Sequence, residues 1–488
     1  MAKDVISKST ERDHPPLLVN EPSHLGKRRC RRTVQLLVLA TFLGFWLRII
    51  PFKWPSLSLR QGTVLPVDHV PDIGLPESLM RTWAQYAPYI PVAKYVPPPP
   101  MCTISQVHVL QRHGTRWPTS NAAAKCKSAV DKLKRVKDYE EDYLVFLKNF
   151  TWDLGENDLL PLGARQSFDA GVAAFDRYAH IVSNDNLPFV RAASSTRVVD
   201  SATNWTAGFN VASHNTIKAS VDLILPESGN LTLDDNMCPN AGDGDAESER
   251  WLAIYAPPIT RRLNLAAPGA NLSNKDTYNL MSLCAFHSQA TMTPSPFCGL
   301  FTPEEFRGFE YFGDVDKFYD NGHGGNLGRV RGVGYVNELL ARLTGKPVRD
   351  NTQTNRTLDA SPETFPLDRT LYADFSHDNT MVSIYSALGL FRQYLLPGQK
   401  LNPGDPSSLR TWILSNMVPF GGRMVVERLK CTRAAALPAA FIRILVNDAV
   451  QPLKFCGGVR GLCELHAFVE SQWYSRHDGG GDFERCFD

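Results

Sequence analysis

The sequence of 488 residues predicts an α/β fold, in which helices flank a mixed, mostly parallel sheet and a smaller α domain is inserted. After residue 102, short runs rich in Val, Ile and Leu alternate with longer runs of helical period, which is typical of such a sheet. A hydrophobic fraction of 43% and a charged fraction of 21% indicate a folded globular chain. The stretches 120–165 and 215–330 are less regular, and we expect them to form the helical insertion.

The individual elements follow from local composition and period. The runs predicted as strands are 104–111, 187–193 and 370–376. The runs predicted as helices are 161–179, 196–209, 331–345 and 380–391. Pro161 opens the first helix and Gly345 ends the third, and each residue is common at that kind of helix end.

The first hundred residues differ from the rest of the chain. Nine lysines and arginines and only four acids fall within residues 1–50, so the remainder is slightly acidic and nucleic acid is excluded as a general partner. We expect a cytosolic basic tail (1–32), a signal-anchor transmembrane helix (33–50) and a proline-rich arm (51–100) before a catalytic region (101–488). Positive charge before the apolar run would hold the N-terminus in the cytosol and the body in the lumen or outside. A cleaved signal peptide, giving a secreted protein, is the alternative.

Two further features suit an exported protein. Five sequons predict glycosylation, at Asn149, Asn204, Asn230, Asn271 and Asn355. Nine of the ten cysteines follow the apolar run, and their scattered spacing favours disulfides over a zinc site. Because nine is odd, at least one thiol is free or pairs between chains. Cys30 precedes the apolar run, where palmitoylation is one conceivable fate.

Charged side chains gather where three predicted strands end. Arg112, His113 and Arg116 follow the first strand, Arg191 lies in the second, and His377 with Asp378 follows the third. Ligands of open α/β sheets bind outside the carboxyl ends of the strands, so we expect these side chains to line one anion site. Taken singly, each group is explained equally well by a surface turn, a salt bridge or a helix cap.

This set of residues fits phosphoryl transfer without a metal or cofactor. Arginine forks bind two phosphate oxygens at once and stay charged. A neutral His113 can attack phosphorus and form a covalent phosphohistidine, while Asp378 protonates the leaving oxygen. Gly114 would let the backbone approach closely. Two histidines and an aspartate are also possible metal ligands, but the neighbouring arginines would repel a cation.

The motifs around these residues resemble known signatures. "RHGTRWPT" (112–119) and "FSHDNT" (375–380) resemble the two signatures of the histidine acid phosphatases. The stretches 83–92, 325–344, 355–390 and 442–453 resemble their counterparts in the fungal phytases, and the likeness spans about residues 80–488. It implies a phosphoglycerate-mutase-like fold, an α/β domain with a smaller inserted α domain.

The resemblance also implies roles for individual residues. His113 would be the nucleophile and Asp378 the general acid. The residues that would bind the phosphate group are Arg112, Arg116, Arg191 and His377. Thr119 would support the loop, and Lys317 would contact the outer phosphates of phytate. The implied disulfides are Cys102–Cys431, Cys238–Cys486, Cys284–Cys298 and Cys456–Cys463, with Cys126 left over. Many fungal phytases carry a pocket lysine near position 122, where this chain has alanine, and Lys125 or Lys127 is a candidate replacement.

We therefore expect an acid phosphomonoesterase that removes phosphate from phytate, myo-inositol hexakisphosphate, through a phosphohistidine. Its expected partners are inositol phosphates and, through the N-terminal helix, a membrane. A broad acid phosphatase with little preference for phytate is the first alternative. A catalytically inactive ectodomain that binds phosphorylated ligands is the second.

Overall fold

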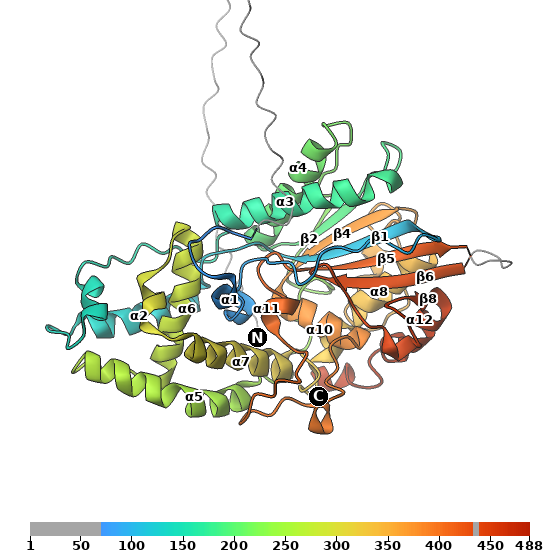
Figure 1. The fold of residues 1–488 in the computed structure, drawn as a ribbon. Coiled ribbons are helices and arrows are strands. Elements are labelled where there is room, and N and C mark those ends of the chain that lie inside the picture. The colour runs from blue at the N-terminus through green and yellow to red at the C-terminus, as the bar shows by residue number, and fades with distance from the viewer. Residues whose placement is uncertain (1–69, 433–438) are drawn as a thin grey trace, which may run out of the picture. The chain divides into compact units, whose positions relative to one another are not determined.

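The computed structural model describes residues 70–432 and 439–488, and within them eight strands form one sheet (Figure 1). The strands are β1 (Cys102–Arg112), β2 (Phe189–Ala193), β3 (Leu223–Leu225), β4 (Leu371–Ser376), β5 (Arg423–Cys431), β6 (Ala439–Val446), β7 (Ala449–Val450) and β8 (Cys463–Glu464). Their order is β3-β2-β4-β1-β5-β6-β7, and β8 also pairs with β6. The pairs from β3 to β1 are parallel, and those from β1 to β7 are antiparallel.

The mixed α/β class predicted from the sequence is therefore confirmed, and the antiparallel half adds strands that the periodicity did not predict. β1 is the central strand and is buried on both faces from Gln106 to Arg112, where polar residues such as His108 and Gln111 stand among Val107, Val109 and Leu110. The register places Arg112 beside Ser376 of β4 and Arg191 of β2 beside Asp374 of β4. The carboxyl ends of β1, β2 and β4 consequently lie at one edge of the sheet.

The predicted helices form, with small shifts at their ends. The helices of eight or more residues are α2 (Ser120–Lys134), α3 (Pro161–Tyr178), α4 (Thr196–Ala212), α5 (Asp245–Ala266), α6 (Asn274–Thr291), α7 (Pro303–Asp320), α8 (Val333–Thr344) and α10 (Asp378–Leu388). Shorter ones are α1 (Glu77–Met80), α9 (Arg356–Asp359), α11 (Leu414–Met417), α12 (Leu465–Ser471) and α13 (Trp473–Arg476). α10 begins two residues earlier than predicted, at Asp378, and ends early because Gly389 adopts a left-handed φ of 83°.

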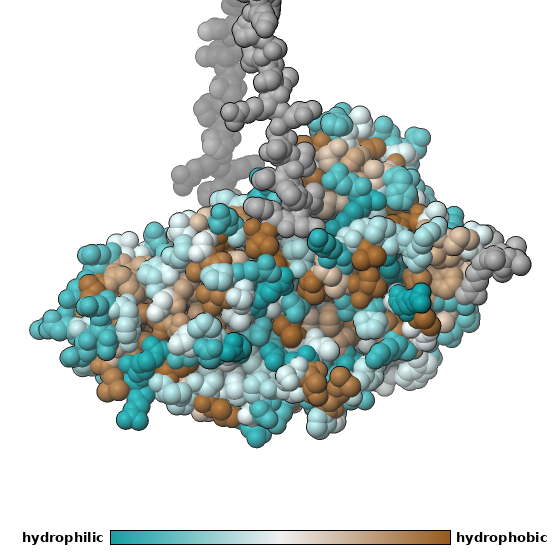
Figure 2. All heavy atoms as spheres, viewed as in Figure 1, coloured by the Kyte–Doolittle hydropathy of each residue, from teal (hydrophilic) through white to brown (hydrophobic). Residues whose placement is uncertain are grey.

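The helices form three groups around the sheet (Figure 1). α3 and α4 cover one face, and α8, α10 and α12 lie on the other. α2, α5, α6 and α7 lie together beside the sheet and have an apolar core of their own, which includes Phe286, Phe297 and Phe306. On the face that Figure 2 shows, hydrophobic side chains are dispersed among polar ones, as is usual for a folded domain.

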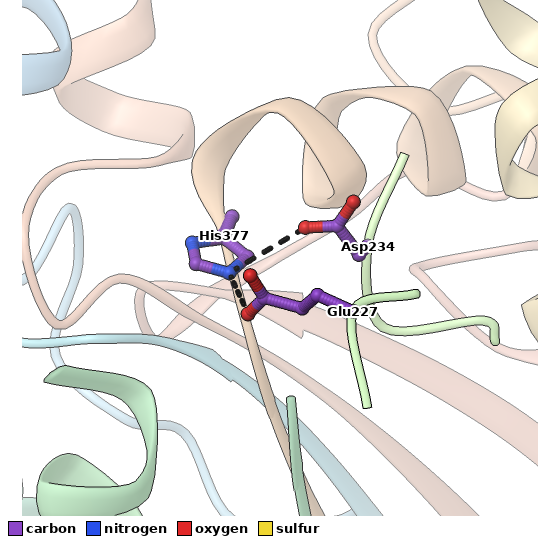
Figure 3. A group of neighbouring side chains, drawn as sticks. All are labelled: Glu227, Asp234 and His377. Atoms are coloured by element: carbon purple, nitrogen blue, oxygen red, sulfur yellow. Dashed lines mark hydrogen bonds and ion pairs between the residues drawn. The ribbon is translucent and has the colours of Figure 1, made fainter. Parts of the chain in front are cut away.

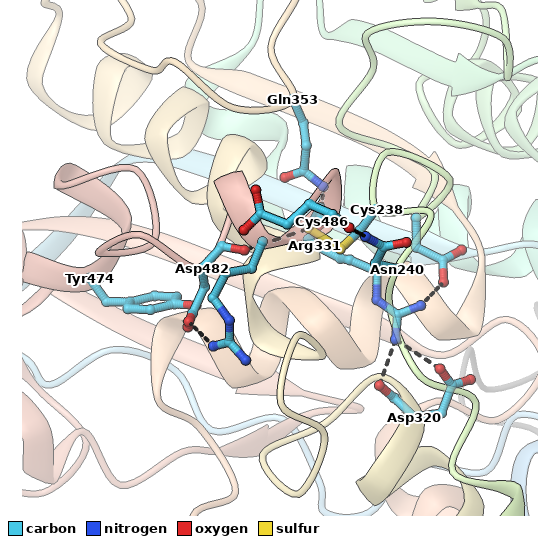
Figure 4. The surroundings of a disulfide bond; sticks show 11 residues. Cys238, Asn240, Asp320, Arg331, Gln353, Tyr474, Asp482 and Cys486 are labelled. Atoms are coloured by element: carbon cyan, nitrogen blue, oxygen red, sulfur yellow. Dashed lines mark hydrogen bonds and ion pairs between the residues drawn. A yellow bond between two sulfur atoms is a disulfide. The ribbon is translucent and has the colours of Figure 1, made fainter.

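Four disulfides join the described parts of the chain, and they have the pairings that the family resemblance implied: Cys102–Cys431, Cys238–Cys486, Cys284–Cys298 and Cys456–Cys463. Figure 4 shows how Cys238–Cys486 ties the C-terminal segment to the loop after β3, next to Arg331, which pairs with Asp320 at 2.8 Å. Cys126 is a free thiol, and burial raises its pKa to about 12.

Several predictions concern residues outside the described ranges. The basic tail, the 33–50 anchor, the first part of the proline-rich arm and Cys30 all fall there, and they stay predictions. The described part of the arm packs on the body, because Trp83 and Ile90 are fully or almost fully buried. Among residues 70–432 and 439–488, no helix is both long and apolar enough to span a membrane.

The five sequons differ in their surroundings. Asn149, Asn230 and Asn271 are exposed. Asn204 and Asn355 are partly buried: Asn204 donates to the Asp200 carbonyl at 2.8 Å, and the Asn355 side chain caps α9. Glycosylation stays a prediction, and the exposed sequons fit it best.

Candidate active site

The loop that follows β1 is held from several directions. The His113 amide donates to the Ser376 carbonyl (3.1 Å), and the His113 carbonyl accepts from the Gly421 amide (3.0 Å). A methyl group on Gly114 would lie only 2.2 Å from the Gly163 carbonyl oxygen, so this close backbone approach needs glycine. The start of α3 therefore fixes the loop against the end of β1.

His113 is prepared as a nucleophile by its hydrogen bond and its surroundings. Its Nδ1 lies 2.9 Å from the Gly114 carbonyl, which can only accept, so Nδ1 carries the proton and Nε2 keeps its lone pair. Nε2 is buried and has no hydrogen-bond partner in the described structure. Burial, followed by the charges of Arg112 and Arg116, lowers the pKa of His113 well below its usual range. The ring is therefore neutral, as attack on phosphorus requires.

Arg112 and Arg116 flank the imidazole, as the sequence predicted. Arg112 is fully buried; its guanidinium donates to the Val418 carbonyl (2.7 Å) and pairs with Asp378 (3.1 Å). Arg116 donates to the Trp117 carbonyl (2.7 Å), and its Nε is buried without a hydrogen-bond partner. Both guanidinium groups lie over the Phe420 ring, at 4.5 and 5.8 Å from its centre, which limits their movement.

The prediction that Arg191 binds phosphate is not supported by its position in the structure. Its side chain is 2% exposed and donates to Asp374 (2.7 Å) and Glu338 (2.6 Å). Arg191 lies within β2 rather than beyond its end, so its guanidinium meets the neighbouring strand and α8. The structure therefore assigns Arg191 to a buried ion cluster that joins the sheet to α8.

Arg197, which sequence reasoning missed, takes the place expected of Arg191. It lies in the first turn of α4, past the carboxyl end of β2, and its Nη2 is 3.4 Å from Nδ1 of His377. Its Nε is buried and has no hydrogen-bond partner in the described part of the chain. The rule that ligands bind beyond strand ends, applied strictly to "VRAASSTR" (190–197), would have indicated this residue.

His377 lies beside the nucleophile, and two carboxylates hold it there. The His113 and His377 ring centres are 5.6 Å apart. As Figure 3 shows, the His377 Nε2 faces Glu227 (2.9 Å) and Asp234 (3.6 Å). Burial alone would raise the pKa of Glu227, but hydrogen bonds from His377 and Ser195 outweigh this effect and bring it to about 2. The sequence carries no local signal for Glu227 or Asp234, because both lie in the irregular stretch after β3.

The same three residues have donor atoms spaced as a metal site requires. One atom from each of Glu227, Asp234 and His377 lies within 4.8 Å of the other two. The guanidinium of Arg197 faces the other ring nitrogen of His377 and opposes a cation there. The hydrogen bonds from His377 and Ser195 to Glu227 give that carboxylate a different use, which is to orient the imidazole.

Asp378 is the carboxylate nearest the arginines. It is the first residue of α10, after His377, which occupies the N-cap position. Burial would raise its pKa, but the charges of Arg112, Lys317 and Arg116 hold the pKa well below its usual range. Lys317, from the last turn of α7, pairs with Asp316 at 3.3 Å, and its charge helps to lower the pKa of Asp378. Lys317 thus lies near Asp378, and the phosphate contact that the resemblance implies for it stays a prediction.

A cavity of about 450 Å³ extends from Thr119 along α2. Thr119 is the N-cap residue of α2; it lines this cavity, and its side chain makes no hydrogen bond to His113 or the arginines in the described structure. Lys125 also lines the cavity, whereas Lys127 pairs with Asp131 (2.8 Å) on the exposed side of the helix. Lys125 is therefore the candidate for the pocket lysine.

These features define a class of enzyme. A neutral imidazole with a free Nε2, arginines on either side and a carboxylate within the same charge cluster are the parts of a site for covalent phosphoryl transfer. Comparison with known proteins agrees with this class. The model of the histidine phosphatase superfamily (branch 2) matches residues 103–447, and the chain belongs to this family. It is therefore a phosphoric monoester hydrolase.

Relatives and solved structures resemble nearly the whole described chain. The proteins named phytase A from Arthroderma benhamiae and Aspergillus terreus are each 38% identical to it, over 82% and 84% of this chain and 91% of theirs. The crystal structure of the phytase from D. castellii has a TM-score of 0.65 at 23% identity and covers 82% of this chain and 86% of its own. A multiple inositol polyphosphate phosphatase from Bifidobacterium longum, solved with inositol hexasulfate, has a TM-score of 0.58 at 14% identity, over 79% and 96% of the two chains. At these identities the two structures support the fold.

Replacing Glu227 with glutamine tests its role as a positioning residue. The variant keeps the size of the side chain but removes the charged acceptor that holds the His377 imidazole at 2.9 Å. We expect kcat/KM to fall by about tenfold or more, because a hydrogen bond to a charged group contributes about 1.5–3 kcal/mol. Glu363→Gln, the same chemical change at an exposed residue, is the control and should leave kcat/KM unchanged. An unchanged kcat/KM in Glu227→Gln would show that the carboxylate only fills space.

Proposed function

We propose that the chain hydrolyses phosphate monoesters through a phosphohistidine on His113, with phytate as its preferred substrate. The observation that carries the proposal is the buried, unpartnered Nε2 of a neutral His113 between Arg112 and Arg116. The relatives named phytase A, at 36–38% identity, support the choice of substrate.

The reaction would proceed in two displacements at phosphorus. His113 Nε2 attacks the phosphorus atom, the bond from phosphorus to the ester oxygen breaks, and Asp378 gives its proton to the leaving alcohol. Arg112, Arg116 and Arg197 stabilise the charge on the other phosphate oxygens. Water then attacks the phosphohistidine, Asp378 takes a proton from it, and inorganic phosphate leaves as His113 regains its lone pair.

Asp378 must be protonated to act as an acid, but the cations around it favour its ionised form. The cations around it keep its pKa low, so it is ionised at neutral and moderately acidic pH. A bound phosphate group brings negative charge to the same arginines and reduces their hold on the Asp378 carboxylate. Protonation therefore accompanies substrate binding and is favoured at acidic pH, as for any carboxylic acid.

A broad acid phosphatase is the second candidate, and the charges along the cavity are its specific support. Besides Lys125 and Lys275, the cavity wall carries the acids Asp245, Glu249 and Asp276. Lys275 is already paired with Glu249 at 2.5 Å. At neutral pH these acids disfavour a hexakisphosphate more than a monophosphate.

We expect phosphate release from both phytate and p-nitrophenyl phosphate, with a decline from pH 5 to pH 8 as the proton on Asp378 becomes scarce. The decline should be steeper for phytate, because its additional phosphates gain a second negative charge in this pH range and are then repelled more strongly by the acids of the cavity wall. Colorimetric phosphate assays from pH 3 to 8 measure both rates on the full chain. Activity on the aryl phosphate alone would favour the broad phosphatase, and inactivity on both would contradict the enzyme.

We also propose that the chain enters the secretory pathway, with residues 33–50 as an anchor or, alternatively, as a cleaved signal. The basic flank and the five sequons support this, and so do four disulfides, which form in oxidising compartments. Sensitivity to a glycosidase in a product that still carries its N-terminus would favour the anchor. Loss of the N-terminus from the mature chain would favour the cleaved signal.

A further inference from the structure

A second concave site lies at the opposite end of the sheet from His113. It is a cleft of about 620 Å³ between α8, the loop after α8, α12 and the end of α13. Arg428 of β5 lines it and pairs in register with Gln106, six residues before Arg112 on β1. At about 3.3 Å per residue this is roughly 20 Å from the catalytic loop. We call this site the basic cleft.

The basic cleft carries cations that the protein itself does not neutralise. In the part of the chain that the structure describes, the side chains of Lys346, Arg349 and Arg428 make no hydrogen bond or ion pair. The Arg428 Nε is buried from solvent and has no hydrogen-bond partner among the described residues. Among the lining residues the single acid is Glu470, which already pairs with Arg476 at 2.8 Å. A buried guanidinium N–H without an acceptor is costly, and an anion in the cleft would relieve that cost.

The surroundings of the basic cleft carry charges of both signs. A neighbouring cleft of about 470 Å³ shares Arg349 and Arg476 with the basic cleft and adds Arg356 and three acids, Asp350, Asp359 and Asp478. Asp478 accepts hydrogen bonds from Asn351. Asp350 is buried and accepts hydrogen bonds from Thr352 and Thr354. Burial, and then the charge of Glu338, raises the pKa of a second acid there, Asp359, to about 7. His466 also lines the basic cleft.

The shape and lining of the basic cleft indicate the kind of anion. Its volume is that of a small-molecule site. Leu340 and Ala341 of α8 and Leu465 and Val469 of α12 supply apolar surface, while the unpaired cations come from two elements, the loop after α8 and β5. Cations from separate elements suit a ligand with more than one phosphate group, and the apolar surface suits the carbon ring that bears them.

We propose that the basic cleft binds a polyphosphorylated ring compound at a site separate from the catalytic one. The substrate proposed above and its partly dephosphorylated products share this chemistry. A bound ligand of this kind would be held on the enzyme without being hydrolysed there, because the basic cleft contains no nucleophile placed like His113. Binding in the basic cleft does not depend on turnover at His113.

Calorimetric titration with phytate at pH 5 tests the proposal on the full chain carrying His113→Ala, which prevents turnover. We expect two binding sites per chain. Adding Lys346→Ala, Arg349→Ala and Arg428→Ala should remove one of them or weaken it by about tenfold or more. The matched control adds Lys94→Ala, Lys218→Ala and Lys400→Ala, exposed lysines that line none of these clefts, and should keep both sites.

A second variant and a second ligand distinguish a binding site in the basic cleft from a loss of folding and from a site for single phosphate ions. Because Arg428 is partly buried, the double variant Lys346→Glu/Arg349→Glu, which changes only exposed loop residues, should give the same loss. Inorganic phosphate should fill the second site at least tenfold more weakly than phytate, and equal affinity would overturn the claim of a polyphosphate ligand. A single site before and after the substitutions, or two sites that survive them, would overturn the proposal itself. Loss of hydrolysis in the wild-type chain would leave this result unaffected, so the two proposals can fail separately.

Discussion

Replacing His113 with alanine is expected to lower phosphate release by about 10⁴-fold or more, whichever phosphate ester is supplied. Without the imidazole there is no nucleophile at the end of β1, and water must attack phosphorus directly among the remaining arginines. Phosphate release by the full chain, measured in steady state and compared with the wild type, gives the ratio. The variant should still bind substrate, because Arg112, Arg116 and Arg197 stay in place.

The covalent step gives this prediction a second readout. Wild-type chain mixed briefly with substrate and quenched in alkali should carry one acid-labile phosphate, which His113→Ala should lack. Asp378→Asn is the matched comparison. It should lose much more activity on phytate, whose alcohol leaving group needs a proton, than on p-nitrophenyl phosphate, whose leaving group does not. Residual activity of His113→Ala near the wild-type level would contradict the assignment of the nucleophile.

The parts of the site that the sequence predicted are those that are local in the chain. Arg112, His113 and Arg116 lie at the end of a strand that its Val, Ile and Leu content predicts, and His377 and Asp378 directly follow another strand. Local rules place such residues at the carboxyl edge of the sheet without knowledge of the remaining fold. The helix ends were predicted for the same reason, since Pro161 and Gly345 act within one turn.

The parts that the sequence did not predict depend on contacts between distant segments. Glu227 and Asp234 reach His377 across about 150 residues of chain, from a stretch with no regular period. The antiparallel strands β5 and β6 follow a long loop region and are recognised as part of the sheet only through their pairing with β1 and with each other. The role of Arg191 could not be predicted for a further reason. The alternation of side chains along a strand does not tell which face of the sheet lies toward the ligand and which lies toward an ion cluster.

Arg191→Ala is expected to cost about 3–5 kcal/mol of unfolding free energy, because it leaves Asp374 and Glu338 buried without their main counter-charge. Burial opposes the charged form of Asp374, yet Arg191 and Arg342 hold its pKa below the usual range. A depressed pKa gives stability that is present above the unfolded value and is lost as the pH falls. The cost of Arg191→Ala should therefore be larger at pH 7 than at pH 3, where the Asp374 carboxyl of the variant takes up a proton.

Arg197→Ala should show the opposite pattern, and the pair of variants distinguishes a structural arginine from a catalytic one. Arg197 is partly exposed at the start of α4 and has no ion pair in the described structure, so its removal should change the unfolding free energy by about 0.5 kcal/mol or less. Its loss should lower kcat/KM by about 100-fold or more, since one donor to the transferring phosphoryl group disappears. Urea unfolding at both pH values and steady-state kinetics on both variants measure the two quantities. A stable Arg191→Ala with the larger loss of kcat/KM would return Arg191 to the phosphate site, because a buried ion cluster cannot lose its central cation without cost.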